Sequence, residues 1–147
     1  MEAVKQGGTV VGVCSSTHAV LAALKRSPSE LASYQQKIFE IDDHMGIGIC
    51  GLTADARTLS KYMQNECLNH KYVYDSPLPV ARLVNRLGDK HQQTTQMSSR
   101  RPYGIGLLII GCDETGPHLF QTCPSGNVQE YFGMVSWFVG CRVGCAC

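Results

Sequence analysis

Short apolar stretches separated by small or polar residues fill the first third of the chain and predict paired strands. Thr9–Cys14 and His18–Lys25 flank a Ser-Ser-Thr turn, a spacing that is typical of a β-hairpin. Lys37–Ile41 and Met45–Cys50 form a second pair around two aspartates. Several strands are apolar at successive positions, as in Ala19–Leu24, rather than alternating. Such runs indicate strands that are covered on both faces.

Two amphipathic helices follow, each with apolar residues at intervals of three and four. The first begins after a turn at Thr53, and the second begins near Pro79, a residue suited to the first position of a helix. Their predicted buried faces are Ala56, Leu59, Met63 and Cys67, and Val80, Leu83, Val84 and Leu87. Gly104–Cys112 and His118–Thr122 then return to strand-like patterns. Because helices and strands are grouped rather than alternating, the order favours α+β with antiparallel sheets, and the doubly covered strands favour a layered α/β/β/α sandwich.

Composition excludes several classes of function. The 147 residues suffice for one domain with a core, and a charged share of 17% beside an apolar share of 44% is typical of a globular chain. A net charge of +1 gives no field that would recruit nucleic acid or an anionic membrane, and no apolar run is long enough to span a bilayer. The first residues lack the apolar region of a secretory signal, and most of the eight cysteines stand singly in apolar segments. These features predict a reduced, cytosolic protein.

The polar residues predict no metal or cofactor site. The five histidines are widely spaced and form no paired ligand motif. Cys141, Cys145 and Cys147 are the only clustered cysteines, and structural zinc needs a second paired set that the sequence does not supply. The glycine-rich stretch Gly46–Gly51 lacks the lysine and hydroxyl residue of a phosphate-binding loop. We therefore expect no cofactor and no metal.

Gly51–Arg57 is the most informative segment, because a buried strand turns directly into a helix there. Gly51 can adopt a backbone angle that other residues avoid, and Thr53 is a suitable N-cap. Asp55 falls in the first helical turn, where the helix dipole favours a negative charge. Asp55 and Arg57 could also be interpreted as an acid–base pair, although a capping role explains them with ordinary helix chemistry.

The same segment, together with Arg101–Gly104 (RPYG), resembles the alpha-type subunits of the proteasome core particle. The other matching stretches are Met1–Gly7, Ser29–Asp43, Ser76–Pro79, Arg101–Leu107 and His118–Gly126. The resemblance implies an N-terminal nucleophile hydrolase-like four-layer sandwich. It also implies a non-catalytic subunit of the outer ring, which supports ring assembly, substrate entry and regulator docking in ubiquitin-dependent protein breakdown. The implied partners are other alpha subunits, beta-ring subunits and the C-terminal tails of regulatory particles, in the cytoplasm and the nucleus.

The resemblance also assigns roles to two groups of residues. Lys37, Gly7 and Leu52 match a pocket between neighbouring subunits that receives the C-terminal carboxylate of an activator tail, a charge-assisted contact for the lysine. The residues that match the contact with the beta ring are Asp55, Arg57, Leu59 and Met63. By spacing alone, Lys37 would instead be a plain surface lysine at the start of a strand.

An alternative function is that of an N-terminal nucleophile threonine peptidase, the activity of the family's beta subunits. Removal of the residues before Thr9 would place its α-amino group beside its hydroxyl. Alignment through Gly12 and Lys37 instead puts Gly8 at the nucleophile position and Leu24 at the position of the acidic partner. The resemblance therefore predicts no catalytic residue in this chain.

Both ends of the chain depart from the family pattern. The gating tail expected before the first residue is absent, and residues 135–147 match neither the expected strand nor the expected long helices. We therefore expect a partial alpha-subunit domain over residues 1–134, an unmatched cysteine-rich tail over residues 135–147, and an incomplete sandwich without its C-terminal helices. Such a chain would expose apolar surface and be poorly stable alone. A fragment that does not assemble is the third alternative.

Overall fold

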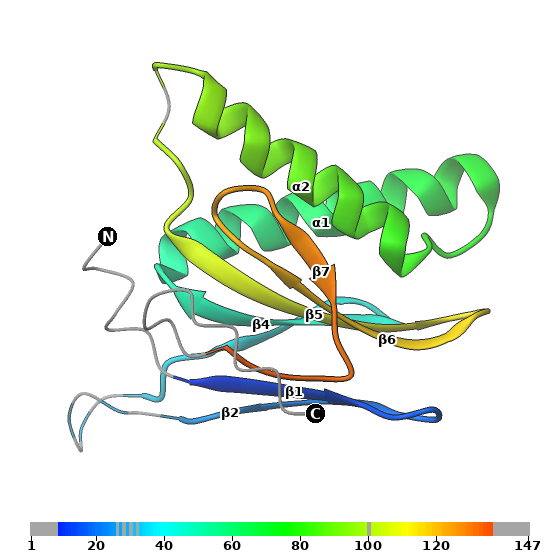
Figure 1. Ribbon diagram of the computed structural model, residues 1–147, viewed down its shortest axis with the longest axis horizontal. Coiled ribbons are helices and arrows are strands. Elements are labelled where there is room, and N and C mark those ends of the chain that lie inside the picture. Colours follow the sequence, from blue (N-terminus) through cyan, green and yellow to red (C-terminus); the bar gives the residue numbers. More distant parts are fainter. Residues whose placement is uncertain are drawn as a thin grey trace.

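The computed structural model describes residues 9–25, 27, 29, 31, 33–99 and 101–136. Its elements are β1 (Val10–Cys14), β2 (Ala19–Ala23), β3 (Ile38–Asp42), β4 (Met45–Gly51), α1 (Thr53–Tyr74), α2 (Val80–Gln96), β5 (Ile105–Asp113), β6 (Gly116–Thr122), β7 (Val128–Glu130) and β8 (Gly133–Ser136), as Figure 1 shows. The strands and helices predicted within these residues are confirmed, with small shifts at their ends. Pro79, for example, lies one residue before α2 rather than at its first position. The strands β7 and β8 were not predicted.

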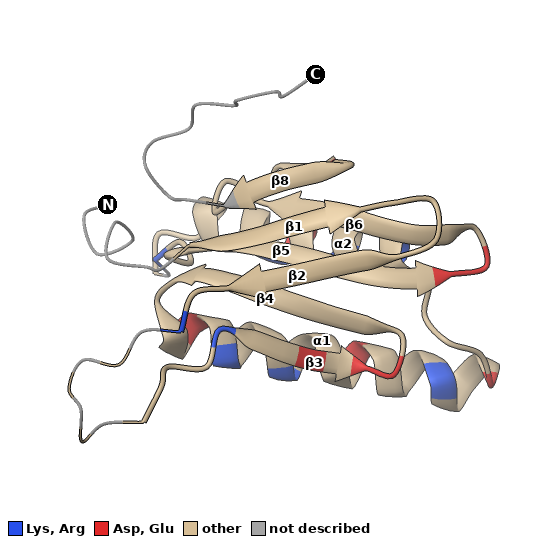
Figure 2. Ribbon diagram, turned by 90° about the horizontal axis from the view of Figure 1, so that it is seen from below, with Lys and Arg blue, Asp and Glu red and all other residues tan. Residues whose placement is uncertain are grey.

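The strands form two antiparallel sheets that pack face to face. One sheet has the order β2-β1-β8, and the other has the order β3-β4-β5-β6-β7. Both described helices cover one face of the five-stranded sheet, and the three-stranded sheet covers its other face (Figures 1 and 2). The prediction of an α+β sandwich is confirmed, with helix, sheet and sheet as the layers that the described residues form. Neither described helix is long and apolar enough to cross a membrane.

The larger core lies between the helices and the five-stranded sheet. The two helical faces predicted from the spacing of apolar residues are confirmed, since all of those side chains are at most 2% exposed. They pack with Ile47 of β4 and with Leu107 and Ile109 of β5. Complete burial of a side chain of this size stabilises the fold by about 1.5–3 kcal/mol. This layer therefore fixes both helices on the sheet.

A second core lies between the two sheets. It is built around Val10, Cys50, Leu108 and Leu119. Because successive side chains of a strand point to opposite faces, Leu107 faces the helices while Leu108 faces the other sheet. The predicted two-sided cover is confirmed for this strand, whose residues 105 and 107–109 are 0% exposed. The sheets come so close that a Cβ on Gly48 would lie 2.6 Å from Val10 Cγ1.

The outer face of the three-stranded sheet contradicts the expectation that β2 is covered on both sides. Residues of β2 alternate between half-buried and exposed positions, because only one face packs on the other sheet. Val20 is 58% exposed, Val13 opposite it on β1 is 54% exposed, and Val135 on β8 is 53% exposed. The expected exposed apolar surface is thus present on this face. Because β8 includes Val135 and Ser136, it crosses the boundary that the sequence predicted at residue 134.

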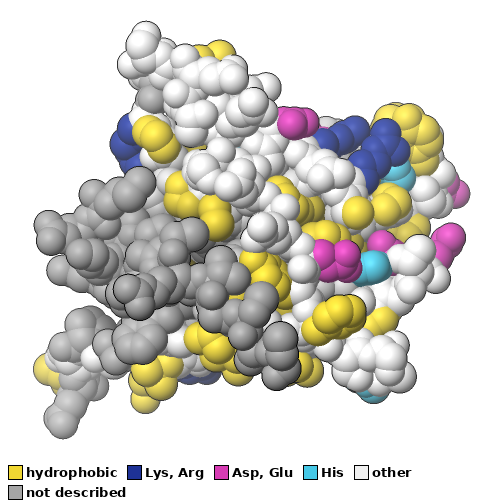
Figure 3. Space-filling view, viewed as in Figure 1, with side chains coloured by type: hydrophobic (Ala, Val, Ile, Leu, Met, Phe, Trp, Pro, Cys, Tyr) yellow, Lys and Arg dark blue, Asp and Glu magenta, His cyan; other side chains and the backbone are white. Residues whose placement is uncertain are grey.

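The last turn of α1 exposes aromatic side chains. Tyr72 is 92% exposed and Tyr74 is 59% exposed, and the Arg82 guanidinium lies 5.9 Å from the centre of the Tyr74 ring. Figure 3 shows basic and hydrophobic side chains side by side at this end of the molecule.

The helix α1 ends where Asp75 takes a left-handed φ of 50° and donates its N–H to the Lys71 carbonyl oxygen.

Candidate functional site

The junction between β4 and α1 is held by the backbone of the segment Arg101–Gly104. The Leu52 N–H donates to the Gly104 carbonyl oxygen at 3.2 Å. Gly51 has a φ of 125°, and a Cβ there would lie 2.4 Å from that same oxygen. A side chain at this position would have to displace the neighbouring backbone, so the predicted need for glycine is confirmed.

Thr53 is not the N-cap of α1, and this part of the sequence prediction is wrong. Leu52 holds the N-cap position in an extended conformation and makes no side-chain cap. The Thr53 hydroxyl oxygen instead accepts a hydrogen bond from Gln35 Nε2 at 2.6 Å. The hydroxyl is therefore used to tie the segment before β3 to the start of the helix.

Asp55 connects the first turn of α1 to the segment that precedes β5. Its two carboxylate oxygens accept hydrogen bonds from Arg101 Nη1 at 2.8 Å and Nη2 at 2.7 Å, and Oδ2 also accepts from the Gly104 N–H at 3.1 Å. The Asp55 side chain is 10% exposed, whereas that of Arg101 is 65% exposed. The hydrogen bonds from Arg101 hold the pKa of the Asp55 carboxyl below its ordinary value. Asp55 is thus an ionised structural partner of Arg101, and the geometry does not support an acid–base pair with Arg57.

Lys37 lies at the end of the sheet that adjoins this junction. Its carbonyl oxygen accepts a hydrogen bond from the Ile49 N–H at 2.9 Å, and Gln35 reaches Thr53, so the segment that carries Lys37 runs beside the start of α1. Lys37 is only 7% exposed, which excludes a plain surface lysine. Among the described residues, its ammonium forms no ion pair with a carboxylate.

The structure places one of the other two residues predicted for the activator pocket. Leu52 is partly buried and packs against the larger core, directly before α1. Gly7 lies outside the described residues. The fold therefore brings Lys37 and Leu52 to the same end of the five-stranded sheet, while the role of Gly7 stays a prediction.

The residues predicted to contact a beta ring differ in exposure. Arg57 is exposed on α1, and Asp55 is buried against Arg101. Leu59 and Met63 are 0% exposed and belong to the larger core of the chain itself. Their side chains do not reach the surface, because they continue the apolar face of the helix. The contact of Leu59 and Met63 with a beta ring stays a prediction.

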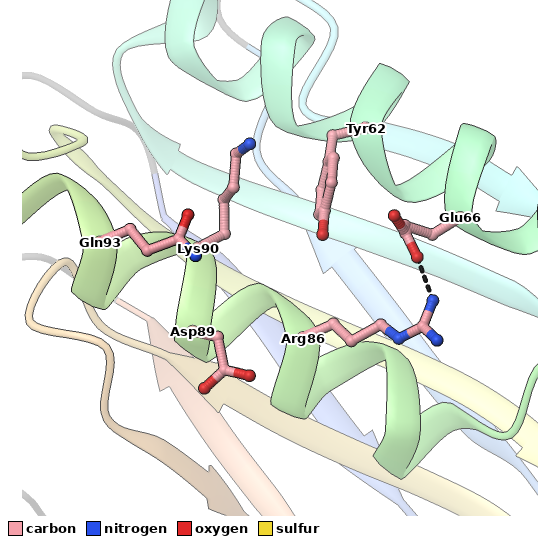
Figure 4. A pocket seen from close by; sticks show the side chains of 6 residues that line it. All are labelled: Tyr62, Glu66, Arg86, Asp89, Lys90 and Gln93. Carbon is pink, nitrogen blue, oxygen red and sulfur yellow. Dashed lines mark hydrogen bonds and ion pairs between the residues drawn. The ribbon is translucent and has the colours of Figure 1, made fainter.

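A polar groove between α1 and α2 is a feature that the sequence did not predict. It has a volume of about 330 Å³ and is lined by Tyr62, Glu66, Arg86, Asp89, Lys90 and Gln93 (Figure 4). Glu66 and Arg86 form an ion pair across the groove, and Lys90 Nζ lies 4.7 Å from the centre of the Tyr62 ring. Burial, reinforced by the Glu66 charge, raises the pKa of the Tyr62 hydroxyl. All six residues fall in pairs that are four positions apart along their helices, which is the one sequence signal of a shared polar face.

No charged side chain of the described residues is placed by a hydrogen bond to activate Thr9 as a nucleophile. Thr9 lies just before β1, and its carbonyl oxygen accepts a hydrogen bond from the Leu24 N–H at 3.3 Å. Within the described residues, no acidic or basic side chain is hydrogen bonded to the Thr9 hydroxyl. Leu24 is 52% exposed and offers no charge that could orient a base. Gly8, at the aligned nucleophile position, lies outside the described residues.

The part of the chain that the structure describes contains no group of three or more His, Cys, Asp or Glu side chains arranged to hold a metal ion. Cys141, Cys145 and Cys147 lie outside that part. Cys67 shows why buried cysteines behave as small apolar groups, because burial raises the pKa of its thiol to about 12.

Comparison with known proteins identifies the family. A family model described as proteasome subunit matches residues 4–136. Over 131 residues, the chain is 61% identical to proteasome subunit alpha type-1 of Dictyostelium discoideum, and the aligned region covers 89% of this chain and 53% of the relative. It is 57% identical to the alpha type-1 subunit of Drosophila melanogaster over 127 residues, covering 86% of this chain and 46% of the relative.

An alpha type-6 subunit gives a similar result. Over 133 residues, the chain is 51% identical to proteasome subunit alpha type-6 of Saccharomyces cerevisiae, covering 90% of this chain and 57% of the relative. The chain spans about half the length of the curated relatives that it matches. The resemblance to alpha-type subunits is confirmed, and the chain belongs to the proteasome subunit family.

Proposed function

We propose that the chain serves as a non-catalytic subunit of the outer, alpha ring of the proteasome core. There it supports ring assembly, substrate entry and regulator docking in ubiquitin-dependent protein breakdown, in the cytoplasm and the nucleus. One observation carries this proposal: the match to proteins named alpha subunits covers 86–90% of the chain, and the family match includes every described strand and helix. The surroundings of Thr9 support a non-catalytic role over that of a threonine peptidase.

The exposed side of the first turns of α1 is the surface that we propose for contact with a beta ring. Arg57 and Lys61 are exposed there, and Leu59 and Met63 hold the helix on the core from beneath. The paired Asp55 and Arg101 anchor its N-terminal end. In this proposal the exposed charges make the contact, while the buried residues set the position of the helix.

Lys37 is the residue that we propose for docking the C-terminal carboxylate of a regulator tail. A lysine that is 7% exposed and has no described carboxylate partner gains from an incoming anion, because its stem is already desolvated. Leu52 would line the same pocket at the start of α1. Neighbouring alpha subunits complete this pocket in the proposal, so the assembled ring is needed to test it.

Assembly is the first experiment. The full chain would be expressed with an epitope tag, and core particles would be purified through a separately tagged beta subunit and sedimented on a gradient. We expect the chain to co-sediment with the complete core at a fixed ratio to the other alpha subunits. Recovery of the chain only as free protein or aggregate would contradict the proposal and favour a fragment that does not assemble.

Docking is tested on particles that contain the chain. A peptide with the free C-terminal carboxylate of a regulator tail would be compared with its C-terminal amide, on wild-type particles and on Lys37→Met particles. Either the amide peptide or Lys37→Met removes the charge-assisted contact, so each should weaken peptide binding about tenfold or more. The two effects should not add when both changes are combined, because they remove the same contact. Lys71→Met, which changes an exposed lysine in the last turn of α1, is the matched control. Equal affinity of wild-type and Lys37→Met particles would remove Lys37 from the pocket.

A further inference from the structure

His118 of β6 lies between two carboxylates that come from different strands. Its Nε2 is 3.2 Å from Asp113 Oδ1 at the end of β5, and its Nδ1 is 2.6 Å from Glu130 Oε1 at the end of β7. Thr115 Oγ1 lies 2.7 Å from the same Nε2 and donates its own proton to Asp113. The imidazole also stacks on Phe120, with ring centres 5.9 Å apart. The ring thus joins three consecutive strands of the sheet.

The two carboxylate contacts of His118 depend on how many protons its imidazole carries. A carboxylate only accepts hydrogen bonds, and a neutral imidazole carries a single N–H donor. With Asp113 at one ring nitrogen and Glu130 at the other, only the doubly protonated imidazolium satisfies both contacts. Because the Thr115 hydroxyl donates to Asp113, its oxygen can accept from Nε2 but cannot supply the missing donor.

Asp113 is held in place by more contacts than Glu130. Asp113 is 17% exposed at its side chain and also accepts hydrogen bonds from the backbone N–H and the hydroxyl of Thr115. Glu130 is 54% exposed, and His118 is its one described ion-pair partner. Loss of a proton from the ring would therefore release Glu130 rather than Asp113.

We propose that His118 is a pH-sensitive latch that holds the end of β7 on β6 while it is protonated and releases it when it is neutral. The edge strand β7 has only three ladder pairs with β6, from Thr122 with Val128 to Phe120 with Glu130. Directly after Glu130, the Tyr131 N–H donates to the Leu119 carbonyl oxygen at 2.9 Å, and the chain crosses to β8 in the other sheet. The latch accordingly controls the crossover between the two sheets.

The neighbouring charges set the direction of the response. The hydrogen bond to Glu130 raises the pKa of His118 above its ordinary value, with support from the Asp113 charge. A raised folded-state pKa means that the stabilisation is complete below the ordinary histidine value and is lost as pH rises through the folded one. The Cys14 thiol of β1 also lies near Glu130, and burial together with the Glu130 charge raises its pKa. No Lys or Arg of the described residues is ion-paired to His118, Asp113 or Glu130.

Amide exchange on the full chain, followed from pH 6 to pH 9 and corrected for the intrinsic base-catalysed rate, tests the latch. We expect the protection of the Tyr131 amide to fall about two- to fivefold as His118 titrates, the size typical of a partly exposed ion pair. The Ile49 amide, bonded to Lys37 in the other half of the sheet, should keep its protection.

Two variants separate the latch from a general effect of pH. Glu130→Gln keeps the shape but removes the charge, so it should abolish the pH dependence at Tyr131 and lower the titration midpoint of His118. His18→Asn is the control, because the His18 side chain is exposed and, among the described residues, is hydrogen bonded to the adjacent Thr17. Constant Tyr131 protection across the titration of His118, or an unchanged pH dependence in Glu130→Gln, would overturn the proposal.

Discussion

Arg101 binds both carboxylate oxygens of Asp55 across 46 positions of sequence and thereby fixes the first turn of α1 to the segment before β5. The same carboxylate accepts the Gly104 N–H, and Gly104 in turn accepts the N–H of Leu52. One buried charge therefore organises two backbone segments at the junction where the strand becomes a helix.

Replacement of Asp55 by Asn should destabilise the fold mainly at neutral pH. The amide keeps one acceptor but loses the charge, and we expect a loss of about 1–2 kcal/mol in the free energy of unfolding. Because the folded-state pKa of Asp55 is lowered, its contribution is present above the ordinary aspartate value and is lost as pH falls through the folded one. Urea unfolding between pH 7 and pH 3 should show wild type and Asp55→Asn converging in acid. Asp43→Asn, in an exposed turn, should change neither the free energy of unfolding nor its dependence on pH. If the difference in stability between wild type and Asp55→Asn stayed constant with pH, Asp55 would not be the group that titrates.

Gly51→Ala should cost more stability than Gly116→Ala. Both glycines have nearly the same φ, 125° and 122°, so backbone strain of about 1–3 kcal/mol applies to each. Only at Gly51 would the new Cβ also meet the Gly104 carbonyl oxygen, because Gly116 has open space around it. Urea denaturation of the two variants measures the difference directly. Equal losses would mean that the backbone of Gly104 moves aside without cost.

Arg57→Ala and Leu59→Ala should distinguish a residue of α1 that contacts the beta ring from one that holds α1 on the core of the chain itself. Leu59 is fully buried, so its truncation should lower the free energy of unfolding by about 2–5 kcal/mol. Arg57 is exposed, and its replacement should leave stability within about 0.5 kcal/mol while reducing recovery of the chain with purified core particles. Quantitative recovery is compared with that of Lys71→Met. If Arg57→Ala assembles as well as wild type, the proposed contact surface is wrong.

The double change Val13→Thr with Val20→Thr should raise the solubility of the isolated chain. Both side chains lie on the outer face of the three-stranded sheet and are more than half exposed, so their hydroxyls would be solvated. Val10→Thr, on the inner face at 0% exposure, should instead lose about 1–3 kcal/mol of stability. The concentration that remains in solution after centrifugation, together with urea midpoints, checks both statements. An unchanged soluble concentration in the double variant would show that another surface drives aggregation.

The sequence predicted what depends on local periodicity. The apolar spacing of three and four identified the buried sides of α1 and α2, and the glycine at position 51 marked the turn between β4 and α1. Thr53 was misassigned because its hydroxyl could cap the helix or bond elsewhere, and the partner, Gln35, is 18 positions away. The same apolar spacing predicted that Leu59 and Met63 are buried, whereas their contact with a beta ring is implied by the resemblance and stays a prediction.

Features that join distant segments could not be predicted in this way. Glu66 and Arg86 are 20 positions apart, and only the packing of α1 against α2 brings them together. The outward face of β2 was misjudged for a similar reason, because the apolar run Ala19–Leu24 does not reveal which face has a covering layer. Lys37 was identified through resemblance, and its burial became evident only in the fold.

The pairing of β1 with β8 sets the order in which the protein can fold. It joins Val10 to Ser136, so the three-stranded sheet unites the first described strand with the last. A ribosome releases β1 and β2 long before β8, and contacts between such distant segments form slowly. The edge of β1 that pairs with β8 therefore stays without this partner until residues 133–136 have been made, so completion of the sheet is a late step and the open strand edge is exposed to wrong pairing before it.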